Sequence, residues 1–323
     1  MLRCRCCLPG LVVAALIALS IRAEAQPKTL AGHTEPPYAA VYLPDGQRLV
    51  TGAFDKSIRS WDLNTLTSTQ TLQGHTGLVL CLALSKDGGK LISGSLDNTV
   101  RLWDLTANPP AAAPVQTYQG HGAHVYGVAI HPAQPLALSV SADKTIKWWD
   151  LEKNQNTRTS TAQGGAIYSV AFRTDGQTFL TSGADKTVRA YNTGDGTEAK
   201  QFAGAGDAVY SVAVNAAGQT VAGGGLDRKV FVWDYETGQL SRTLSGHKDD
   251  IYKVEFNPAG TRLLSLGYAG NLQVWDPAQD QPLFASKVAQ VTYSATWSPN
   301  GEQIAVLAGD GKVYLVDVPA SAR

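Results

Sequence analysis

Residues 94–104 read GSLDNTVRLWD, and this stretch returns along the chain in recognisable form at a nearly constant interval. It ends in a Trp-Asp pair or a remnant of one, and successive pairs are separated by 42, 46, 42, 42, 42 and 41 residues. The seven pairs are Trp61-Asp62, Trp103-Asp104, Trp149-Asp150, Tyr191-Asn192, Trp233-Asp234, Trp275-Asp276 and the degenerate Val316-Asp317. A fixed period of this length indicates one supersecondary unit copied seven times.

One repeat unit reads as four short strands separated by turns. Within residues 246–276, a Gly-His pair precedes an alternating run at 251–256, a turn containing Pro and Gly, and a second run at 262–266. A turn bounded by glycines and a third run at 272–275 follow, and residues 239–244 show the fourth run that ends the preceding unit. Because no helical period interrupts this pattern, the sequence predicts an all-β, seven-bladed propeller with four antiparallel strands per blade.

The two ends of the chain complement each other. Residues 27–31 precede His33 as a fourth strand should, whereas the seventh unit stops after its third strand at Val318. We expect the N-terminal strand to complete the seventh blade, because this closes the ring and removes an exposed sheet edge. The predicted organisation is a single seven-bladed β-propeller domain over residues 26–323.

Residues 1–25 differ in character from the repeats. Two arginines near the start precede an apolar stretch over residues 11–21, and Ala23-Glu24-Ala25 provides a small-x-small cleavage site. This pattern is typical of a secretory signal peptide, too short to span a membrane, with cleavage expected before Gln26. A disordered or anchoring N-terminus is the alternative. The signal-peptide hypothesis places the mature protein in the periplasm or outside the cell.

Cysteine usage and charge narrow the function classes. Cys4, Cys6 and Cys7 would leave with the leader, so Cys81 is the single cysteine expected in the mature chain, which excludes an intrachain disulfide. Its apolar surroundings in the sequence are typical of a buried, inert thiol. The 27 basic and 27 acidic residues of the chain balance, without a basic stripe. We therefore expect neither nucleic-acid binding nor membrane insertion, and we expect a monomer.

Taken together, the repeats resemble the WD-repeat β-propeller family, as an exported member of bacterial type, over nearly all of residues 27–318. In that family a His, a Ser or Thr, an Asp and a Trp of each blade form a hydrogen-bonded tetrad. Carried over by position, the resemblance implies three complete tetrads: His33, Thr51, Asp55, Trp61; His75, Ser93, Asp97, Trp103; and His121, Ser139, Asp143, Trp149. Such a set satisfies buried polar groups, and removing one member leaves another unpaired.

Histidine, serine and aspartate also make up hydrolase triads, which raises the possibility of catalysis. Because the set recurs once per blade, we interpret it as a structural staple, that is, a hydrogen-bonded set of side chains that stabilises the blade. His124 and His131 stand outside the tetrads, with no carboxylate or thiol at metal-ligand spacing. The mature chain also has no GxSxG, phosphate-loop or CxxCH motif. No catalytic residue, metal or cofactor is therefore predicted.

Later repeats depart from the tetrad pattern. Gln163 and Ala205 replace the histidine, Gly223 replaces the hydroxyl residue, Ala269 replaces the aspartate, and the seventh repeat keeps only Asp310. We expect the fourth, fifth and seventh blades to rely more on apolar packing and to be the softer part of the ring.

In the WD-repeat family, partners commonly contact the top face, near the start of each first strand and just before the turn aspartate. The first-strand position reads Tyr38, Leu80, Tyr126, Tyr168, Tyr210, Tyr252 and Tyr293. Two placements are open. The rings can surround the channel mouth, or, because Tyr168 alternates in step with Val170 and Phe172, they can be wedged between blades as core.

Large apolar side chains at these and neighbouring positions gather on the sixth, seventh, first and second blades, as an interaction surface would require. The predicted partner-binding residues are Tyr38, Phe54, Leu78, Leu80, Leu96, Tyr252, Tyr268 and Tyr293. The hypothesis is a non-enzymatic scaffold whose rigid propeller docks a protein or peptide on its top face. The alternative is a small-molecule or glycan-binding propeller, or an enzyme accessory subunit, that uses the channel mouth, where His124, Asp249 and Asp250 offer polar groups.

The leader hypothesis has a direct test. If export removes the leader, N-terminal sequencing of the exported protein begins at or near Gln26, because the small residues at positions 23 and 25 fit signal-peptidase cleavage. Recovery of intact Met1 on cytoplasmic protein would contradict the predicted localisation.

Overall fold

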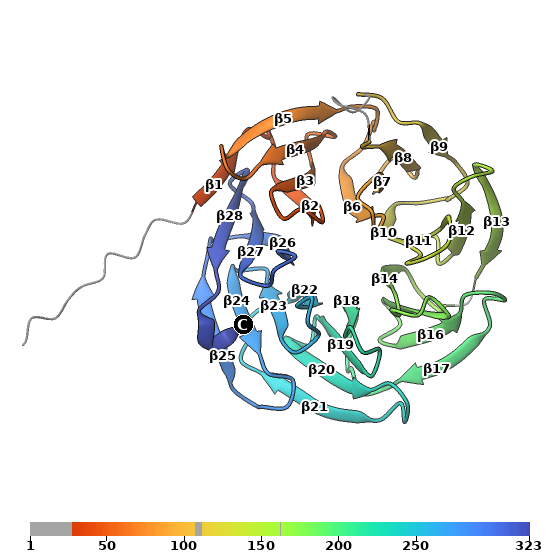
Figure 1. Cartoon of the computed structure of the whole chain (residues 1–323). Helices are drawn as coiled ribbons and strands as arrows, with labels where there is room; N and C mark the ends of the chain where they lie inside the picture. Colours follow the sequence, from red (N-terminus) through yellow and green to blue (C-terminus); the bar gives the residue numbers. More distant parts are fainter. Residues whose placement is uncertain (1–27, 107–111, 162) are drawn as a thin grey trace, which may run out of the picture.

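The structure, a computed structural model, describes residues 28–106, 112–161 and 163–323. The predicted signal peptide over residues 1–25 and its expected cleavage site lie outside the described residues. The described chain forms seven four-stranded antiparallel sheets arranged as blades around a channel (Figure 1). The all-β seven-bladed propeller predicted from the repeat period is therefore confirmed.

Each blade runs from an inner strand at the channel to an outer strand at the rim. The inner strands are β2 (Pro37–Tyr42), β6 (Val79–Leu84), β10 (Val125–Ile130), β14 (Ile167–Phe172), β18 (Val209–Val214), β22 (Ile251–Phe256) and β26 (Thr292–Trp297). The second strands are β3 (Arg48–Ala53), β7 (Lys90–Ser95), β11 (Leu136–Ser141), β15 (Thr178–Gly183), β19 (Thr220–Gly225), β23 (Leu263–Gly267) and β27 (Gln303–Ala308). The third strands are β4 (Ile58–Asp62), β8 (Val100–Asp104), β12 (Ile146–Asp150), β16 (Val188–Asn192), β20 (Lys229–Asp234), β24 (Asn271–Trp275) and β28 (Lys312–Asp317). The outer strands are β5 (Thr67–Leu72), β9 (Gln116–Tyr118), β13 (Gln155–Ser160), β17 (Glu198–Phe202), β21 (Leu240–Ser245), β25 (Pro282–Lys287) and β1 (Lys28–Ala31).

Blades 1 to 6 follow chain order from β2–β5 to β22–β25, and blade 7 joins the two ends of the chain. Its sheet has the order β1-β28-β27-β26, with Lys28 opposite Leu315 and Ala31 opposite Lys312. Figure 1 shows β1 beside β28 at the rim. The predicted closure of the ring by the N-terminal strand is confirmed. A short 3₁₀ helix, η1 (Ala320–Ala322), follows β28, and no helix in the described part of the chain has the length and apolar character needed to cross a membrane.

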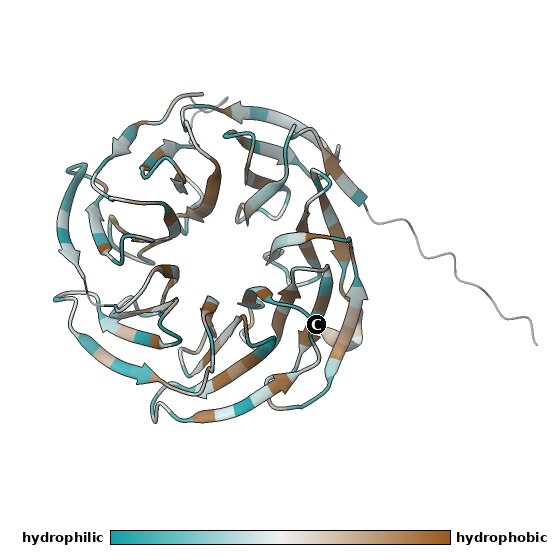
Figure 2. Ribbon diagram, turned by 180° about the vertical axis from the view of Figure 1, so that it is seen from behind, coloured by the Kyte–Doolittle hydropathy of each residue, from teal (hydrophilic) through white to brown (hydrophobic). Residues whose placement is uncertain are grey.

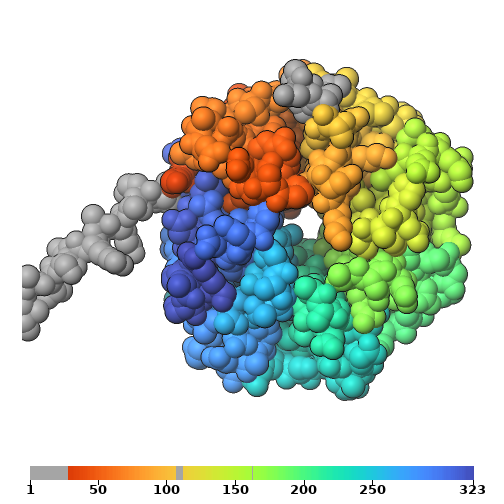
Figure 3. Space-filling model, viewed as in Figure 1, coloured from red at the N-terminus to blue at the C-terminus, as the bar shows by residue number. Residues whose placement is uncertain are grey.

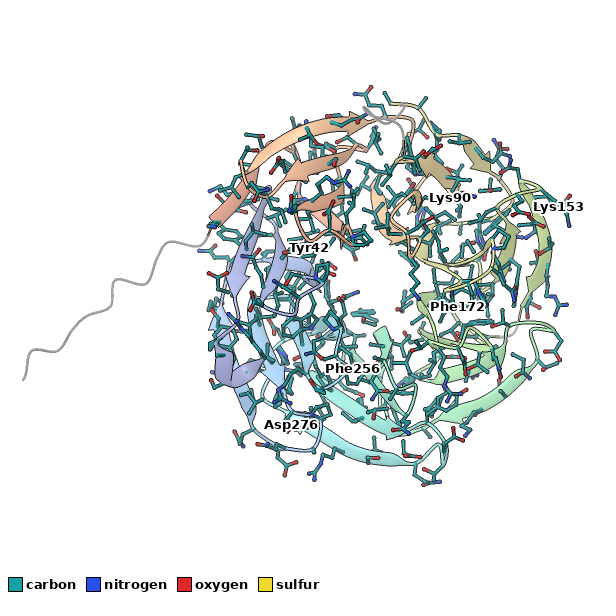
Figure 4. All side chains as sticks on the ribbon, viewed as in Figure 1. Tyr42, Lys90, Lys153, Phe172, Phe256 and Asp276 are labelled. Atoms are coloured by element: carbon teal, nitrogen blue, oxygen red, sulfur yellow. The ribbon has the colours of Figure 1, made fainter. Side chains whose placement is uncertain are left out.

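Neighbouring blades bury one another's faces. Trp103 of blade 2, 1% exposed, packs in one cluster with Val50 and Ile58 of blade 1. Hydrophilic positions recur along the outer strands (Figure 2). Figure 4 shows Tyr42, Phe172 and Phe256 toward the inner side of the ring, and Lys153 and Asp276 at its periphery. Each blade therefore depends on its neighbours for burial, as repeat units of this size generally do.

The four residues of each implied tetrad come together in blades 1 to 3. In blade 2, Trp103 Nε1 donates to Ser93 Oγ at 2.9 Å, Ser93 Oγ lies 2.7 Å from His75 Nε2, and His75 Nδ1 lies 2.8 Å from Asp97 Oδ2. The same contacts, at 2.7–2.9 Å, join two further sets: His33, Thr51, Asp55 and Trp61 in blade 1, and His121, Ser139, Asp143 and Trp149 in blade 3. Each set links the third strand, through the second strand, to the top-face loop that leads into the inner strand.

The charge states of the tetrads follow from burial and hydrogen bonding. Burial lowers the pKa of His75 and His121, although the Asp97 and Asp143 carboxylates oppose this shift. The rings are therefore neutral near pH 7, with Nδ1 donating to the aspartate and Nε2 accepting from the hydroxyl. Burial would raise the pKa of Asp97, but hydrogen bonds from His75 and Thr99 outweigh it and hold that pKa well below its usual range.

A hydroxyl residue two positions after the aspartate is a fifth member that sequence reasoning missed. Thr99 Oγ1 and Thr145 Oγ1 each donate to the preceding aspartate at 2.6 Å, and Ser57 does the same in blade 1. The signal was present in the sequence as the recurring Asp-x-Ser/Thr spacing. The residue between the two, such as Lys56 at φ 67°, takes the left-handed conformation that the turn requires.

The remaining blades replace the tetrad in different ways. In blade 4, Gln163 Nε2 donates to Thr181 Oγ1 in place of a histidine. In blade 5, Trp233 Nε1 donates to the Ala203 carbonyl at 2.7 Å. In blade 6, Ala269 stands at the aspartate position, and Asp249 from the facing loop supplies a carboxylate that accepts from the Ala269 amide.

The staple interpretation predicts unequal effects of two matched substitutions. Asp97→Ala leaves the buried His75 Nδ1 donor without its partner and should lower the free energy of unfolding by roughly 1–3 kcal/mol. Asp310→Ala, in a blade without a tetrad and at a side chain that is 43% exposed, should lower it much less. Equal losses in urea unfolding of the two variants would contradict the staple interpretation.

The buried histidines also predict how stability depends on pH. Burial lowers the pKa of His247 to about 4 from its ordinary 6.5, despite the opposing charge of Asp249. As the pH falls below about 6.5, His247 binds a proton in the unfolded chain but not in the folded chain. The free energy of unfolding therefore has its full value, as far as His247 is concerned, above about pH 6.5, and it declines as the pH falls toward about 4. His247→Gln copies the residue that blade 4 has at this position. The free energy of unfolding of this variant, measured in urea, should decline less steeply than that of the wild type between about pH 6.5 and pH 4. Parallel pH profiles for the variant and the wild type would be the contrary result.

Candidate functional site

A β-bulge near the start of every inner strand aims one side chain into the channel. In β14, Ile167 pairs with Gly183 and Ser169 with Ser182, so Tyr168 is an extra residue without its own partner in β15. The same shift surrounds Tyr38, Leu80, Tyr126, Tyr210, Tyr252 and Tyr293 in the other blades. A bulge breaks the alternation of a strand and redirects a side chain, so Tyr168 does not share the face of Val170 and Phe172.

The redirected side chains line one mouth of the channel. A cavity of about 400 Å³ is bordered by all seven of these residues, together with small residues just below them such as Ser169 and Ser211. The six tyrosines are half-buried, whereas Leu80 is 8% exposed. Figure 3 shows the opening at the centre of the ring. Of the two placements left open by the sequence, the structure shows the ring around the channel mouth.

The tyrosine rings contact one another from blade to blade. Tyr126 and Tyr168, Tyr168 and Tyr210, and Tyr210 and Tyr252 meet edge to face at centroid distances of 5.4, 5.2 and 5.5 Å. Such aromatic pairs each contribute about 0.5–1.5 kcal/mol beyond burial. The mouth is therefore a continuous aromatic rim over blades 3 to 6, built on strands rather than on mobile loops.

On the opposite side, five aromatic residues form a wider cluster, which we call the aromatic arc. The ring of Tyr268 lies between those of Tyr252 and Tyr293, at centroid distances of 5.2 and 6.2 Å. The ring centroids of Tyr38, Phe54 and Tyr293 lie 5.4 Å from one another, and Phe54 stacks on Tyr38 at an interplanar angle of 22°. The aromatic arc, residues Tyr38, Phe54, Tyr252, Tyr268 and Tyr293, thus spans blades 6, 7 and 1.

The three leucines predicted for the same surface are less available. Leu80 is buried at the channel wall, and Leu78 and Leu96 are half-buried and joined by a backbone hydrogen bond of 2.9 Å. Tyr268, at 40% exposed, offers the most open ring of the predicted set. The accessible part of the surface is therefore centred on blades 6, 7 and 1.

A second cavity lies beside the aromatic arc, between the top loops of blades 6 and 7. It measures about 520 Å³ and is bordered by Tyr268, Ala289, Gln290, Val291, Tyr293, Gly309, Asp310 and Tyr314. Tyr314 donates to Asp310 Oδ2 at 2.6 Å, and this hydrogen bond raises the pKa of Tyr314 to about 12. Sequence reasoning missed Gln290 and Tyr314. Tyr314 stands two residues before the degenerate Val316, where no repeat motif marks it.

The phenols of Tyr168, Tyr210, Tyr252 and Tyr293 are held in their neutral form. Burial raises the pKa of Tyr210 to about 12, and the charges of neighbouring tyrosines, Asp250 and Asp207 add to the shift. Burial likewise raises the pKa of Tyr168, Tyr252 and Tyr293. Neutral phenols can donate as well as accept a hydrogen bond, so the mouth offers both polar and aromatic contacts.

The histidines outside the tetrads have structural partners. His131 Nε2 lies 3.2 Å from the Gly176 carbonyl of blade 4, and its Nδ1 accepts from the amides of Ala133 and Gln134. His124 Nδ1 lies 3.1 Å from the Leu96 carbonyl of blade 2. Both side chains link neighbouring blades. Over residues 28–106, 112–161 and 163–323, no three His, Cys, Asp or Glu side chains are grouped so as to hold a metal ion.

The family profile described as WD domain, G-beta repeat matches residues 25–62, 66–104, 112–150, 154–192, 196–234 and 238–276. The chain belongs to the WD-repeat family. Each matched stretch begins with the outer strand of one blade and ends with the third strand of the next, and the first stretch includes β1. Propellers of this family typically serve protein interaction and are usually not catalytic. No curated protein sequence matches the chain closely enough to be a relative.

Proposed function

We propose that this protein is an exported, non-enzymatic interaction scaffold that docks a protein or peptide partner on the top face over blades 6, 7 and 1. The aromatic arc supports this proposal most directly. Its five rings form one connected series of ring contacts, they are anchored by strand bulges and short turns, and Tyr268 is 40% exposed.

The arc has the chemistry expected of an interface centre. Tyrosine and phenylalanine bring large contact areas with few rotatable bonds, so little side-chain entropy is lost when a partner binds. The turns that present these rings are fixed by backbone hydrogen bonds, such as those of 2.9 Å from Phe54 N to Pro36 O and from Tyr268 N to Asp250 O. A preorganised surface loses less free energy on binding than a mobile one.

The alternative is a propeller that binds a small molecule or glycan in the channel mouth. The 400 Å³ cavity lies within the range of about 300–1,000 Å³ usual for ligand sites, and phenol hydroxyls and Lys253 border it. Asp249, however, is engaged with the Ala269 amide, and Lys253 pairs with Glu255 at 3.2 Å. Fewer polar groups are therefore left to fix the orientation of a small ligand, which favours the protein-docking proposal.

Docking on the arc predicts a specific pattern of binding losses. The double variant Phe54→Ala with Tyr268→Ala should weaken binding of the partner captured from the periplasmic fraction by at least roughly tenfold, about 1.4 kcal/mol. Both side chains lie in surface turns, so the cooperative thermal unfolding transition should persist. Titration calorimetry and a thermal melt measure the two effects on one preparation.

Ala142→Asp with Ala184→Asp is the matched control, because these residues hold the same turn position on blades 3 and 4. This control should leave partner binding unchanged. Loss of binding in the control alone would move the docking surface to the opposite side of the mouth. If neither pair changes the dissociation constant, the top-face proposal fails.

A further inference from the structure

We infer that the cavity between blades 6 and 7 is a subsite for an arginine side chain of the docked partner. The inference rests on the proposed function, because it names the residue that such a partner inserts beside the aromatic arc. The lining combines three tyrosines, Tyr268, Tyr293 and Tyr314, with the carboxylate of Asp310. Among these described lining residues, Asp310 alone carries a formal charge at neutral pH, and that charge is negative.

The Asp310 carboxylate is free for a ligand in a way that the turn aspartates of blades 1 to 3 are not. The turn aspartates of blades 1, 2 and 3 pair with a histidine, and their side chains are 8%, 6% and 15% exposed. In blade 7, Val288 takes the histidine position and Asp310 is 43% exposed. The loss of the tetrad therefore turns a structural carboxylate into one that borders a cavity.

Asp310 keeps its orientation without a histidine. Its Oδ2 accepts from Tyr314, and its Oδ1 accepts from the Lys312 amide at 3.2 Å. Two oxygens can accept about four hydrogen bonds, so capacity remains for a guanidinium. Lys312 Nζ lies 3.8 Å from Oδ2, but both side chains are more than 40% exposed, and such a solvent-screened pair contributes little and can be displaced.

The cavity walls are fixed before a ligand arrives. Hydrogen bonds join the turn of blade 6 to the loop entering blade 7: Val288 N to Gly270 O, Thr292 N to Tyr268 O, and Thr292 Oγ1 to Gly267 O, at 3.0, 2.8 and 2.7 Å. Gly270 has φ 84°, and a Cβ there would lie 1.9 Å from the Ala289 carbonyl oxygen. Only glycine allows this approach, so the wall is built from close backbone contact.

Arginine fits this arrangement better than lysine does. A guanidinium is flat, stacks on aromatic rings and donates two parallel hydrogen bonds to a carboxylate. An ammonium group presents a strongly hydrated point charge and cannot stack in this way. The ring centroids of Tyr268 and Tyr293 lie 6.2 Å apart at an interplanar angle of 61°, so these two rings contact each other edge to face. Tyr268, 40% exposed, offers a ring face at the cavity on which a planar guanidinium can stack.

The test uses the full chain labelled with ¹³C at its 12 tyrosines, with signals assigned by single Tyr→Phe substitutions. N-acetyl-arginine methylamide should produce saturable chemical-shift changes at Tyr268, Tyr293 and Tyr314, with a dissociation constant on the order of 1 mM. The uncharged N-acetyl-norleucine methylamide should not. A lack of saturation with arginine, equal response to norleucine, or saturable shifts with N-acetylglucosamine instead would overturn the inference.

Three variants identify which groups of the cavity are responsible for arginine binding. Asp310→Asn should weaken arginine binding by at least roughly tenfold, because a charge-assisted hydrogen bond is lost. Asp207→Asn removes an exposed charge from the top face of blade 5 and should leave binding unchanged. Tyr314→Phe keeps the ring but removes the hydroxyl that holds Asp310, so it should weaken arginine binding, but less than Asp310→Asn does. Equal binding by Asp310→Asn and wild type would contradict the assignment.

The same variants separate this subsite from the docking surface. If Phe54→Ala weakens capture of the partner while Asp310→Asn does not, the docking surface stands and the arginine subsite is rejected. If the arginine probe saturates in the cavity and Asp310→Asn weakens the partner, while Phe54→Ala has no effect, the subsite stands and the arc is not the main contact.

Discussion

The pairing of β1 with β28 is the interaction on which the rest of the structure depends. A four-stranded blade is too small to bury its own faces, so each one is stable only between two neighbours, and an open ring would leave two apolar faces in water. Residues 28–31, opposite 312–315, complete blade 7 with a strand from the other end of the chain. Leu30, 1% exposed, packs there in one cluster with Val313 of blade 7 and Trp61 of blade 1. The closed ring then fixes the distances between blades, and with them the shape of the mouth.

The inner-strand bulges turn this framework into a surface. Without them the residues at the tyrosine position would follow Val170 and Phe172 into the space between blades. One extra residue per inner strand frees a side chain from the ladder and points it at the axis. Because the ring holds seven such positions at a fixed separation, Tyr126, Tyr168, Tyr210 and Tyr252 meet their neighbours at ring-contact distance, as do Tyr293 and Tyr38. Tyr268 bridges the interval between Tyr252 and Tyr293. Leu80, buried and without a ring, interrupts the rim between Tyr38 and Tyr126.

The repeat period was enough to predict the fold, since seven copies of a strand-sized pattern have few other ways to bury their faces, and the missing fourth strand near Val318 was enough to predict the closure. The placement of the tyrosines was not predictable, because a bulge of this kind has no residue signature and strict alternation led equally well to the core. The contact in blade 6, where Asp249 of the facing loop accepts from the Ala269 amide, was not predictable because it joins two loops that are about 20 residues apart in the sequence. The expected softness of blades 4, 5 and 7 stays a prediction. Gln163 and Trp233 nevertheless show that the first two keep a polar link of another kind.

In blade 7, the substitutions that remove the tetrad also leave the carboxylate of Asp310 available to a ligand. A carboxylate that holds a buried histidine is committed to it, because leaving that histidine unpaired would destabilise the fold. Valines fill the histidine, hydroxyl and tryptophan positions of blade 7 and pack in one apolar cluster with Leu264 and Leu266 of blade 6. The same carboxylate is therefore not committed to a buried histidine. Asp310 can then be oriented by Tyr314 toward a cavity next to the exposed Tyr268. Binding chemistry in this ring is therefore expected where the repeat is most degenerate, since the regular blades have already used their polar groups to hold themselves together.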